Sequence, residues 1–394
     1  MLLIIALCAS RTISTQKKFL NQLKIEENKK KITDYEYAFH SEYEGELIIP
    51  DTVNTIGNHA FYCCSGFTGK LYIPSSVTSI GDYAFAECTG FNGNLILTNS
   101  LNYIGKSSFA NCINFNDTLR IPHHITTIHN SSFENCVNFN SIDFPQSIIH
   151  IYSRAFAGCI GLKGKLYLPL NLQTLGSYAF SGCSGFDGDL KIPFGIKSFE
   201  AGIFEGCSGF DGNLITGPIS TYVNEKAFYG CSKLKGALNL ALPKSIGDYA
   251  FAGCSKLTGP IQIQGIGYLG EGAFSGCSGF SLLTMSYEQN FTIIPNFAFY
   301  KCTGLAGQLN ITSCTQSIGE SAFCMCTGLT KLIVSESIKE IGPLAFYRCS
   351  GLSGNLSLLT SLSEICDYTF YYCSNFTGSL EIPQSVTKIG MYSF

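Results

Sequence analysis

Residues 69–88 read GKLYIPSSVTSIGDYAFAEC, and this pattern returns along almost all of the 394-residue chain. When the sequence is laid over itself, the copies align on one Phe each, at intervals of 22 to 25 residues. The aligned residues are Phe39, Phe61, Phe85, Phe109, Phe133, Phe156, Phe180, Phe204, Phe228, Phe251, Phe274, Phe299, Phe323, Phe346, Phe370 and Phe394. A single period of this size predicts a repeat solenoid rather than separate globular domains.

Each copy predicts a short strand followed by a compact return. Residues 70–73 alternate polar and apolar side chains, which indicates a strand with one buried face. Pro74 then ends the strand because it lacks an N–H group. Val77 and Ile80 lie three residues apart, and Phe85 follows five residues later with Gly81 between them. This spacing predicts a turn and a short helical or 3₁₀ return. One coil cannot bury its own apolar residues, so we expect the coils to stack.

This pattern resembles the BspA-like class of leucine-rich repeats, whose units carry a strand ending in Pro, then Ile-Gly, then Ala-Phe and a Cys or Asn. The resemblance covers residues 39–394. It implies a leucine-rich-repeat solenoid with a curved parallel β-sheet on its concave face, and surface display with adhesion to host or matrix proteins. In six coils another residue replaces the Gly after Ile, and we expect these coils to be looser. The replacing residues are His129, Tyr152, Glu200, Asn224, Pro295 and Cys366.

The pattern divides the chain into three parts. Residues 1–10 resemble the apolar region of a signal segment, although the first cation comes only at Arg11. Residues 11–38 are predicted to form an N-terminal cap, and residues 39–394 hold about 15 units of the solenoid. The last unit stops at Phe394, before its Cys, so the sequence predicts an array that is cut short at the C-terminus. No apolar run is long enough to predict a transmembrane helix.

Composition and motifs argue against several functional classes. The formal net charge is −3, and no basic block is large enough to bind nucleic acid. The sequence contains no nucleophile elbow, phosphate loop or dinucleotide fingerprint, so we expect neither an enzyme nor a cofactor. Three histidines fall within one coil, but His123 and His124 follow the strand on a turn, where solvated histidines are the common case, so we expect no metal site.

Fourteen of the 19 cysteines occupy one position per copy, three residues after the Phe, from Cys64 to Cys373. Residues stacked in this way point in parallel, which is poor geometry for disulfide bonds. A small, weakly donating side chain suits a buried turn. We therefore predict a ladder of buried thiols, with a disulfide framework as the alternative interpretation.

The outward strand positions vary between copies, and we expect any recognition to depend on them. Period 2 places the polar residues of the strand on one face, and the predicted sheet is large enough for a protein partner. Tyr and Arg dominate interface energetics, so we place the contact patch between residues 70 and 191. Its residues are Lys70, Tyr72, Arg120, Asp143, Lys165, Tyr167, Asp189 and Lys191. Ordinary solvated side chains are the alternative interpretation.

The sequence thus predicts a non-catalytic recognition or adhesion protein, at the cell surface or secreted, that binds a protein partner through its concave face. The partner expected from the resemblance is a host or matrix protein. One alternative is a structural surface component that self-associates through the open C-terminal edge. Another is an intracellular scaffold for protein interactions.

Overall fold

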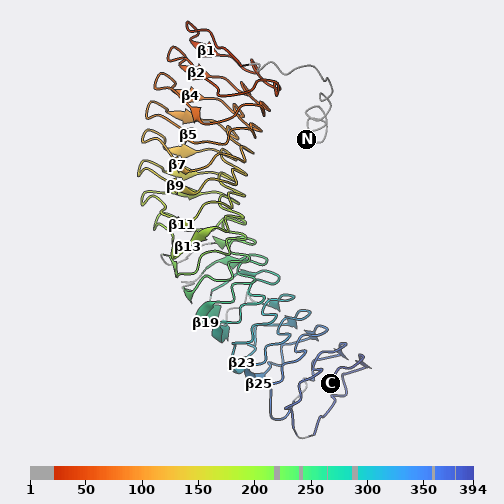
Figure 1. The fold of residues 1–394 in the computed structure, drawn as a ribbon. Helices are drawn as coiled ribbons and strands as arrows, with labels where there is room; N and C mark the ends of the chain where they lie inside the picture. Colours follow the sequence, from red (N-terminus) through yellow and green to blue (C-terminus); the bar gives the residue numbers. More distant parts are fainter. Residues whose placement is uncertain are drawn as a thin grey trace. The chain divides into compact units, whose positions relative to one another are not determined.

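The computed structural model describes residues 22–216, 222–238, 243–263, 265–285, 292–356, 360–377 and 379–394. The predicted signal segment 1–10 and residues 11–21 of the predicted cap lie outside this part of the chain. The chain divides into two compact units, Met1–Phe186 and Asp187–Phe394, and each is described by itself. In both, the backbone winds into stacked coils joined by short parallel strands (Figure 1). The fold is a parallel β-solenoid of the leucine-rich-repeat type.

The strands at the repeated position where the sequence predicted one form the first ladder of each unit, and the members that pair do so in parallel. They are β3 (Leu71–Tyr72), β5 (Leu95–Ile96), β7 (Thr118–Arg120), β9 (Ser141–Asp143) and β11 (Gly164–Lys165) in the first unit, β13 (Phe186–Asp187) at its boundary, and β14 (Leu190–Lys191), β15 (Leu214–Ile215), β17 (Gly236–Ala237), β19 (Leu257–Ile263), β21 (Phe280–Met285), β23 (Gly307–Asn310) and β25 (Leu329–Ile333) in the second.

A second ladder of strands precedes the conserved turn of each coil, and the sequence prediction missed it. Its strands are β1 (Lys31–Ile32), β2 (Thr55–Ile56), β4 (Ser79–Ile80), β6 (Tyr103–Ile104), β8 (Thr127–Ile128), β10 (His150–Ile151) and β12 (Thr174–Leu175) in the first unit, and β16 (Tyr222–Val223), β18 (Ser245–Ile246), β20 (Tyr268–Leu269), β22 (Ile293–Ile294), β24 (Ser317–Ile318), β26 (Glu340–Ile341), β27 (Glu364–Ile365) and β28 (Lys388–Ile389) in the second. In only six of these 15 strands does a Thr or Ser directly precede the repeated apolar residue, so the sequence carried no consistent signal for this ladder.

The helical or 3₁₀ return predicted from the sequence is wrong, because the described residues contain no helix. The segment after Gly81 is a run of tight turns in which Tyr83 and Glu87 take left-handed φ angles of 56° and 63°. The N–H groups of Tyr83, Phe85 and Glu87 each donate to a carbonyl of the next coil at 2.8 Å. A helix would need these donors for its own carbonyls. The described residues likewise contain no helix that could cross a membrane.

The core consists of the residues that repeat, as the sequence predicted. Leu71, Ile73, Val77, Ile80 and Phe85 of one coil are all completely buried. The Phe side chains form a stack along each unit. In the first unit, the ring centroids of successive members are 5.1 to 5.5 Å apart from Phe61 to Phe180.

The first member of the Phe stack differs from the one assigned by the sequence alignment. Tyr37, rather than Phe39, stacks on Phe61 at 5.3 Å. Phe39 is 44% exposed and meets the ring of Tyr62 edge-on. The alignment was misled because a second aromatic residue lies two positions further along the chain.

The ladder cysteines are buried thiols, as predicted. The Sγ atom of Cys88 donates to the carbonyl oxygen of Phe61 in the preceding coil at 2.9 Å, and Cys112 does the same to Phe85 at 3.0 Å. The arrangement continues in the second unit, where Cys254 donates to Phe228 at 3.1 Å. Each thiol therefore gives a second hydrogen bond to a backbone carbonyl that already accepts an N–H within its own turn, as Phe61 does from Cys64.

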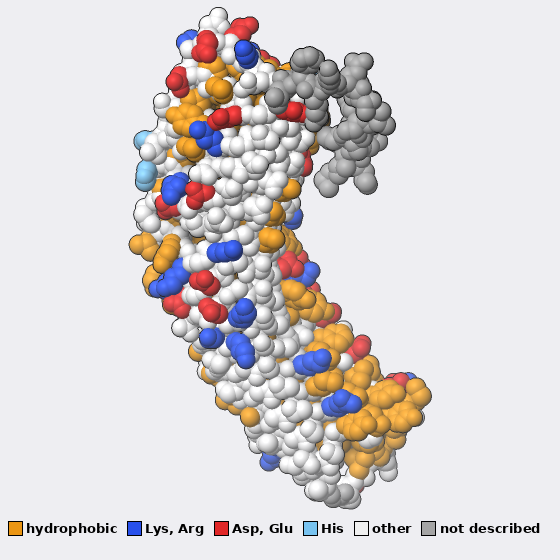
Figure 2. Space-filling model, in the orientation of Figure 1, with side chains coloured by type: hydrophobic (Ala, Val, Ile, Leu, Met, Phe, Trp, Pro, Cys, Tyr) orange, Lys and Arg blue, Asp and Glu red, His pale blue; other side chains and the backbone are white. Residues whose placement is uncertain are grey.

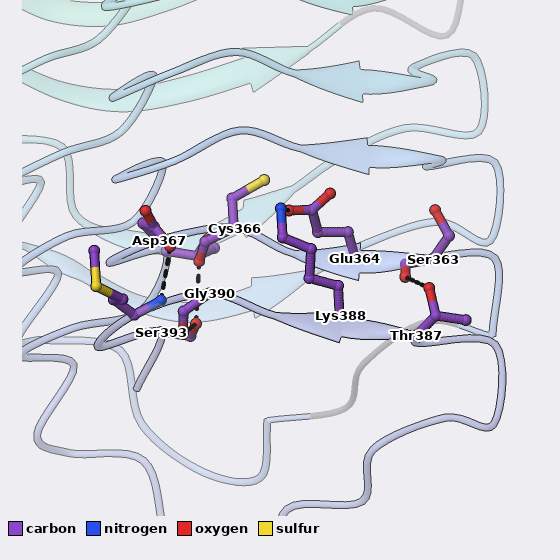
Figure 3. A network of polar contacts seen from close by, with 10 residues as sticks. Ser363, Glu364, Cys366, Asp367, Thr387, Lys388, Gly390 and Ser393 are labelled. Atoms are coloured by element: carbon purple, nitrogen blue, oxygen red, sulfur yellow. Dashed lines mark hydrogen bonds and ion pairs between the residues drawn. The ribbon is translucent and has the colours of Figure 1, made fainter.

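A side-chain oxygen also joins neighbouring coils next to the Ile-Gly pair. Asp82 Oδ1 accepts the N–H of Lys106 at 2.8 Å, and Asp367 Oδ1 accepts that of Met391 at 2.7 Å (Figure 3). A Cβ atom on Gly105 would lie 2.6 Å from Asp82 Oδ1 and 2.5 Å from the carbonyl carbon of Gly81. Gly is therefore required by the close approach of the preceding coil, rather than by the backbone freedom inferred from the sequence.

We expect Gly105→Ala to lower the free energy of unfolding by about 2–3 kcal/mol, because the new methyl group must push two backbones apart. The measurement is urea denaturation of the full chain. Gly69→Ala is the matched control, since Gly69 has a φ of 78° but nothing within 4 Å of its Cβ position. Its expected loss is about 1 kcal/mol, because Ala in a left-handed conformation is strained even where nothing clashes with its Cβ. A loss for Gly105→Ala no larger than that of the control would contradict the close-approach explanation.

Coils without this Gly are looser in some places only. Among the described residues, the second ladder is interrupted between β6 and β8 at His129, between β20 and β22 at Pro295, and between β26 and β27 at Cys366. Pro295 has no N–H with which to continue the ladder. Tyr152 and Asn224 keep the bond, because their N–H groups donate to Ile128 at 2.9 Å and to Phe199 at 2.8 Å. The predicted loosening therefore corresponds to a break in the ladder at three of the six replaced positions and is absent at Tyr152 and Asn224.

Candidate binding surface

The outward residues of the first ladder in the first unit form a continuous row, which we call the N-terminal strand face. It comprises Ile48, Tyr72, Ile96, Arg120, Asp143, Lys165 and Tyr167, all exposed. The ladder fixes their order, since Tyr72 is the register partner of Ile96 and Arg120 that of Asp143. The side chains alternating with them, such as Leu71 and Ile73, are buried. The face is therefore held from beneath by the core.

The first part of this face is apolar. Ile48, Tyr72 and Ile96 occupy equivalent positions in three consecutive coils and are 60%, 42% and 37% exposed. Figure 2 shows hydrophobic side chains gathered over these coils, which carry β2 to β5 in Figure 1. The predicted patch omitted Ile48 and Ile96, although each lies 24 residues from Tyr72. That spacing is the signal by which the sequence could have identified them.

Two pairs of opposite charges lie on or beside this face. Lys70 Nζ lies 3.6 Å from a carboxylate oxygen of Glu46 in the preceding coil. Arg120 and Asp143 stand side by side on β7 and β9. Opposite charges on neighbouring strands attract one another weakly in water. Both pairs therefore remain able to exchange partners when another surface approaches.

Tyr167 is the most exposed aromatic residue of the face, at 72%. It follows β11, and the leucines on either side of it, Leu166 and Leu168, are buried. Its ring must therefore project outward. Lys165, two residues earlier, is also exposed on the same face.

Two of the predicted patch residues belong to the second unit. Lys191 is exposed on β14, opposite Ile215 of β15. Asp189 is half-buried, and its Oδ1 accepts the N–H of Asn213 in the next coil at 2.9 Å. Asp189 thus joins two coils in the same way as Asp82, which gives it a structural function that the sequence prediction did not foresee.

The described residues contain no group of three or more His, Cys, Asp or Glu side chains placed to hold a metal ion. His129 instead lies beside aromatic rings, with Tyr103 at 5.0 Å. Burial lowers the pKa of His129 and favours its neutral form. The N-terminal strand face offers exposed apolar side chains and neighbouring opposite charges.

The family follows from the repeat itself. The family model for the BspA type leucine-rich repeat region, of six copies, matches residues 14–117, 114–235, 221–353 and 292–394. The chain belongs to this family. The resemblance noted from the sequence is thereby confirmed. The leucine-rich-repeat fold of this family typically serves protein interaction and surface roles and is generally non-catalytic.

Solved structures with similar folds include several bacterial proteins. A leucine-rich repeat protein from Bacteroides ovatus is 24% identical, with a TM-score of 0.48, over 94% of this chain and 74% of that one. A leucine-rich cell surface protein from Faecalibacterium prausnitzii is 20% identical, with a TM-score of 0.45, over 92% and 83%. The pneumococcal vaccine antigen PcpA is 16% identical, with a TM-score of 0.38, over 94% and 85%. No curated protein matches the chain.

Proposed function

We propose that this BspA-type chain is a non-catalytic recognition protein, at the cell surface or secreted, that binds a protein partner through the N-terminal strand face. The observation that supports this most strongly is the contiguous exposure of Ile48, Tyr72 and Ile96 beside the Arg120 and Asp143 pair. Single exposed apolar residues are ordinary on protein surfaces. Apolar residues that lie together and are bordered by charges are typical of a surface that another protein covers.

The composition and rigidity of the face also favour a macromolecular partner. Tyr and Arg residues supply much of the binding energy at protein interfaces, and Tyr72, Arg120 and Tyr167 are spread over several coils. Their backbones are fixed by parallel pairing on β3, β7 and the coil of β11. Little conformational entropy is lost when a partner binds such a preorganised surface. We propose that this face is the concave side expected from the sequence.

The test is a triple variant, Tyr72→Ala, Arg120→Ala and Tyr167→Ala. A protein captured from host-cell or matrix extracts on the full chain is purified, and its Kd is measured for each form by biolayer interferometry. We expect the triple variant to weaken binding by about 100-fold or more, because it removes two aromatic anchors and a guanidinium group.

The matched control removes two Tyr residues and one cation from elsewhere in the same unit: Tyr83→Ala, Tyr103→Ala and Lys106→Ala. These residues lie on or beside the second ladder. The control should bind within about 3-fold of the wild type, since surface substitutions away from an interface change little. Unchanged binding by the first triple variant, or an equal loss in the control, would refute the proposal.

Localisation is tested independently by labelling intact cells with a reagent that does not cross membranes. Labelling that fails to reach the protein would rule out the surface assignment in favour of the intracellular scaffold. Light scattering over a concentration series tests the self-association hypothesis. A monomer at every concentration would remove it.

A further inference from the structure

A second surface with the composition of an interface lies in the second unit, far along the sequence from the N-terminal strand face. It is formed by residues that directly follow the stacked Phe of four successive coils. We call it the aromatic–cation row, and its members are Tyr300, Lys301, Met325, Tyr347, Arg348 and Tyr372. The N–H of Lys301 donates to Cys324 at 2.8 Å, that of Met325 to Tyr347 at 2.7 Å, and that of Arg348 to Tyr371 at 2.8 Å. These bonds hold the row in a fixed order.

Both cations of the row lie against aromatic rings. Lys301 Nζ is 5.1 Å from the ring centre of Tyr300. The guanidinium carbon of Arg348 is 5.3 Å from the ring centre of Tyr347 and 5.1 Å from that of Tyr372. Such contacts fix the direction of a cation and leave its hydrogen-bond donors free.

Neither cation is neutralised by an acidic side chain in the part of the chain that the structure describes, since no ion pair there includes Lys301 or Arg348. Cys324 lies between their coils, and burial raises the pKa of its thiol to about 11. Lys301 and Arg348 are the charges that oppose this rise. The row is therefore locally electropositive.

Backbone conformation shows that these side chains are not required for folding. Lys301, Met325, Arg348 and Tyr372 have φ angles of 56°, 62°, 55° and 61°. Four earlier coils of the same unit have Gly at this position, with φ between 73° and 79°: Gly206, Gly230, Gly253 and Gly276. A left-handed conformation is unfavourable for a residue with a Cβ atom, and outliers of this kind often mark functional positions.

The equivalent position in the first unit is occupied differently. Glu87, Asn111 and Asn135 are joined there by side-chain hydrogen bonds, from Asn111 Nδ2 to Glu87 at 2.7 Å and from Asn135 Nδ2 to Asn111 at 2.8 Å. Those side chains satisfy one another. In the aromatic–cation row, by contrast, the charged groups face outward without an anion.

We propose that the aromatic–cation row binds an acidic segment of a protein partner. Carboxylates would pair with Lys301 and Arg348, since a guanidinium group forms strong, often bidentate bonds to a carboxylate. The two cations are two coils apart, which corresponds to about 10 Å at the spacing of neighbouring strands. Carboxylates three residues apart in an extended polyproline-type segment are separated by about 9 Å, which fits this spacing. The rings of Tyr347 and Tyr372 would contact the residues between them.

The probe is a fluorescent twelve-residue peptide with the repeat Glu-Pro-Pro, and its comparison is the same peptide with Gln in place of Glu. We expect the full chain to bind the Glu peptide and not the Gln peptide, with an affinity that falls as salt is added. The test variant is Lys301→Gly with Arg348→Gly, which copies the residue found in the earlier coils. It should weaken binding by about 10-fold or more while the Tm stays equal or rises, because the strained conformation is relieved.

Two controls separate this site from general charge attraction. Lys233→Ala with Lys256→Ala removes two exposed lysines of the same unit and should leave binding within about 2-fold. Tyr347→Ala with Tyr372→Ala keeps both cations but should weaken peptide binding by about 5-fold, while binding of dextran sulfate should not change.

Failure to bind the Glu peptide, or equal losses in the lysine control, would overturn the proposal. Two results together would also overturn it: unchanged peptide binding by the tyrosine variant, and dextran sulfate binding to the full chain more tightly than the Glu peptide does. The site would then be one for polyanions. None of these variants alters the N-terminal strand face, so each surface can fail its test without the other.

Discussion

Raising the pH above about 9 is expected to unfold the protein, because the ladder of buried thiols must stay protonated. Burial raises the pKa of Cys159, Cys231 and Cys302 to about 12. In the unfolded chain these thiols titrate near the ordinary value of 9.0. The folded state therefore binds more protons between these two values, so its stability is complete below about pH 9 and falls as the pH rises toward 12.

The effect is large because it is repeated in every coil. At pH 10, each thiol with these two pKa values lowers the free energy of unfolding by about 1 kcal/mol. Several such thiols in one cooperative unit would offset a total stability that is typically about 5–15 kcal/mol. Urea denaturation at intervals from pH 7 to 10.5, with a phosphine reductant present, measures the fall.

Cys159→Ala separates the contribution of one buried thiol from that of every other titrating group, because the rest of the chain is unchanged. The variant is expected to be less stable than the wild type at pH 7.5, because the carbonyl of Phe133 loses one of its two donors and keeps only the N–H of Cys136. The difference should shrink by about 1 kcal/mol between pH 7.5 and 10, since the variant has one fewer thiol to ionise. Parallel pH profiles for the two proteins would contradict the thiol explanation.

The repeating part of the fold could be predicted because each core position occurs many times in one sequence. Leu71, Ile73 and Phe85 are buried as expected, and Cys88 donates to a backbone carbonyl. The strands of the second ladder were missed because most have only two residues, and β4 holds just Ser79 and Ile80. A segment that short shows no alternation, so neighbouring coils rather than local propensity determine it.

The turns were mispredicted because their hydrogen bonds join different coils. Phe85 donates to Ser108, 23 residues away, and spacing within one copy cannot show this. The same reason explains Gly105, whose partner Asp82 belongs to the preceding copy. The register of Phe39 was wrong because aromatic identity alone did not distinguish it from Tyr37, which carries the stack.

The sequence correctly indicated which strand side chains point outward, but the predicted patch did not contain all the residues of the N-terminal strand face. Alternation along 70–73 correctly placed Tyr72 outward, and the same rule holds for Tyr167. Ile96 was left out because the patch was assigned from the weight of Tyr and Arg at interfaces and not from apolar exposure. Asp189 was included because its bond to Asn213 in the next coil does not show in the sequence.

Replacing Phe133 by Ala is expected to cost about 3–5 kcal/mol of unfolding free energy, the range measured for removing a buried Phe ring. Phe133 is completely buried and lies between Phe109 and Phe156, with both ring centroids 5.5 Å away. Rings in the neighbouring coils are held by their own backbone ladders and cannot close on the cavity. The loss should appear in urea denaturation as a lower midpoint of the first unit.

Phe39→Ala is the control, because it removes the same side chain from a position that is 44% exposed. Its expected cost is below about 1 kcal/mol, as for other surface substitutions. Tyr37→Ala should cost more than Phe39→Ala, since Tyr37 stacks on Phe61. If Phe39→Ala instead destabilised the protein as much as Phe133→Ala, Phe39 would be the true first member of the stack, and the register of the first coil would have to be shifted by two residues.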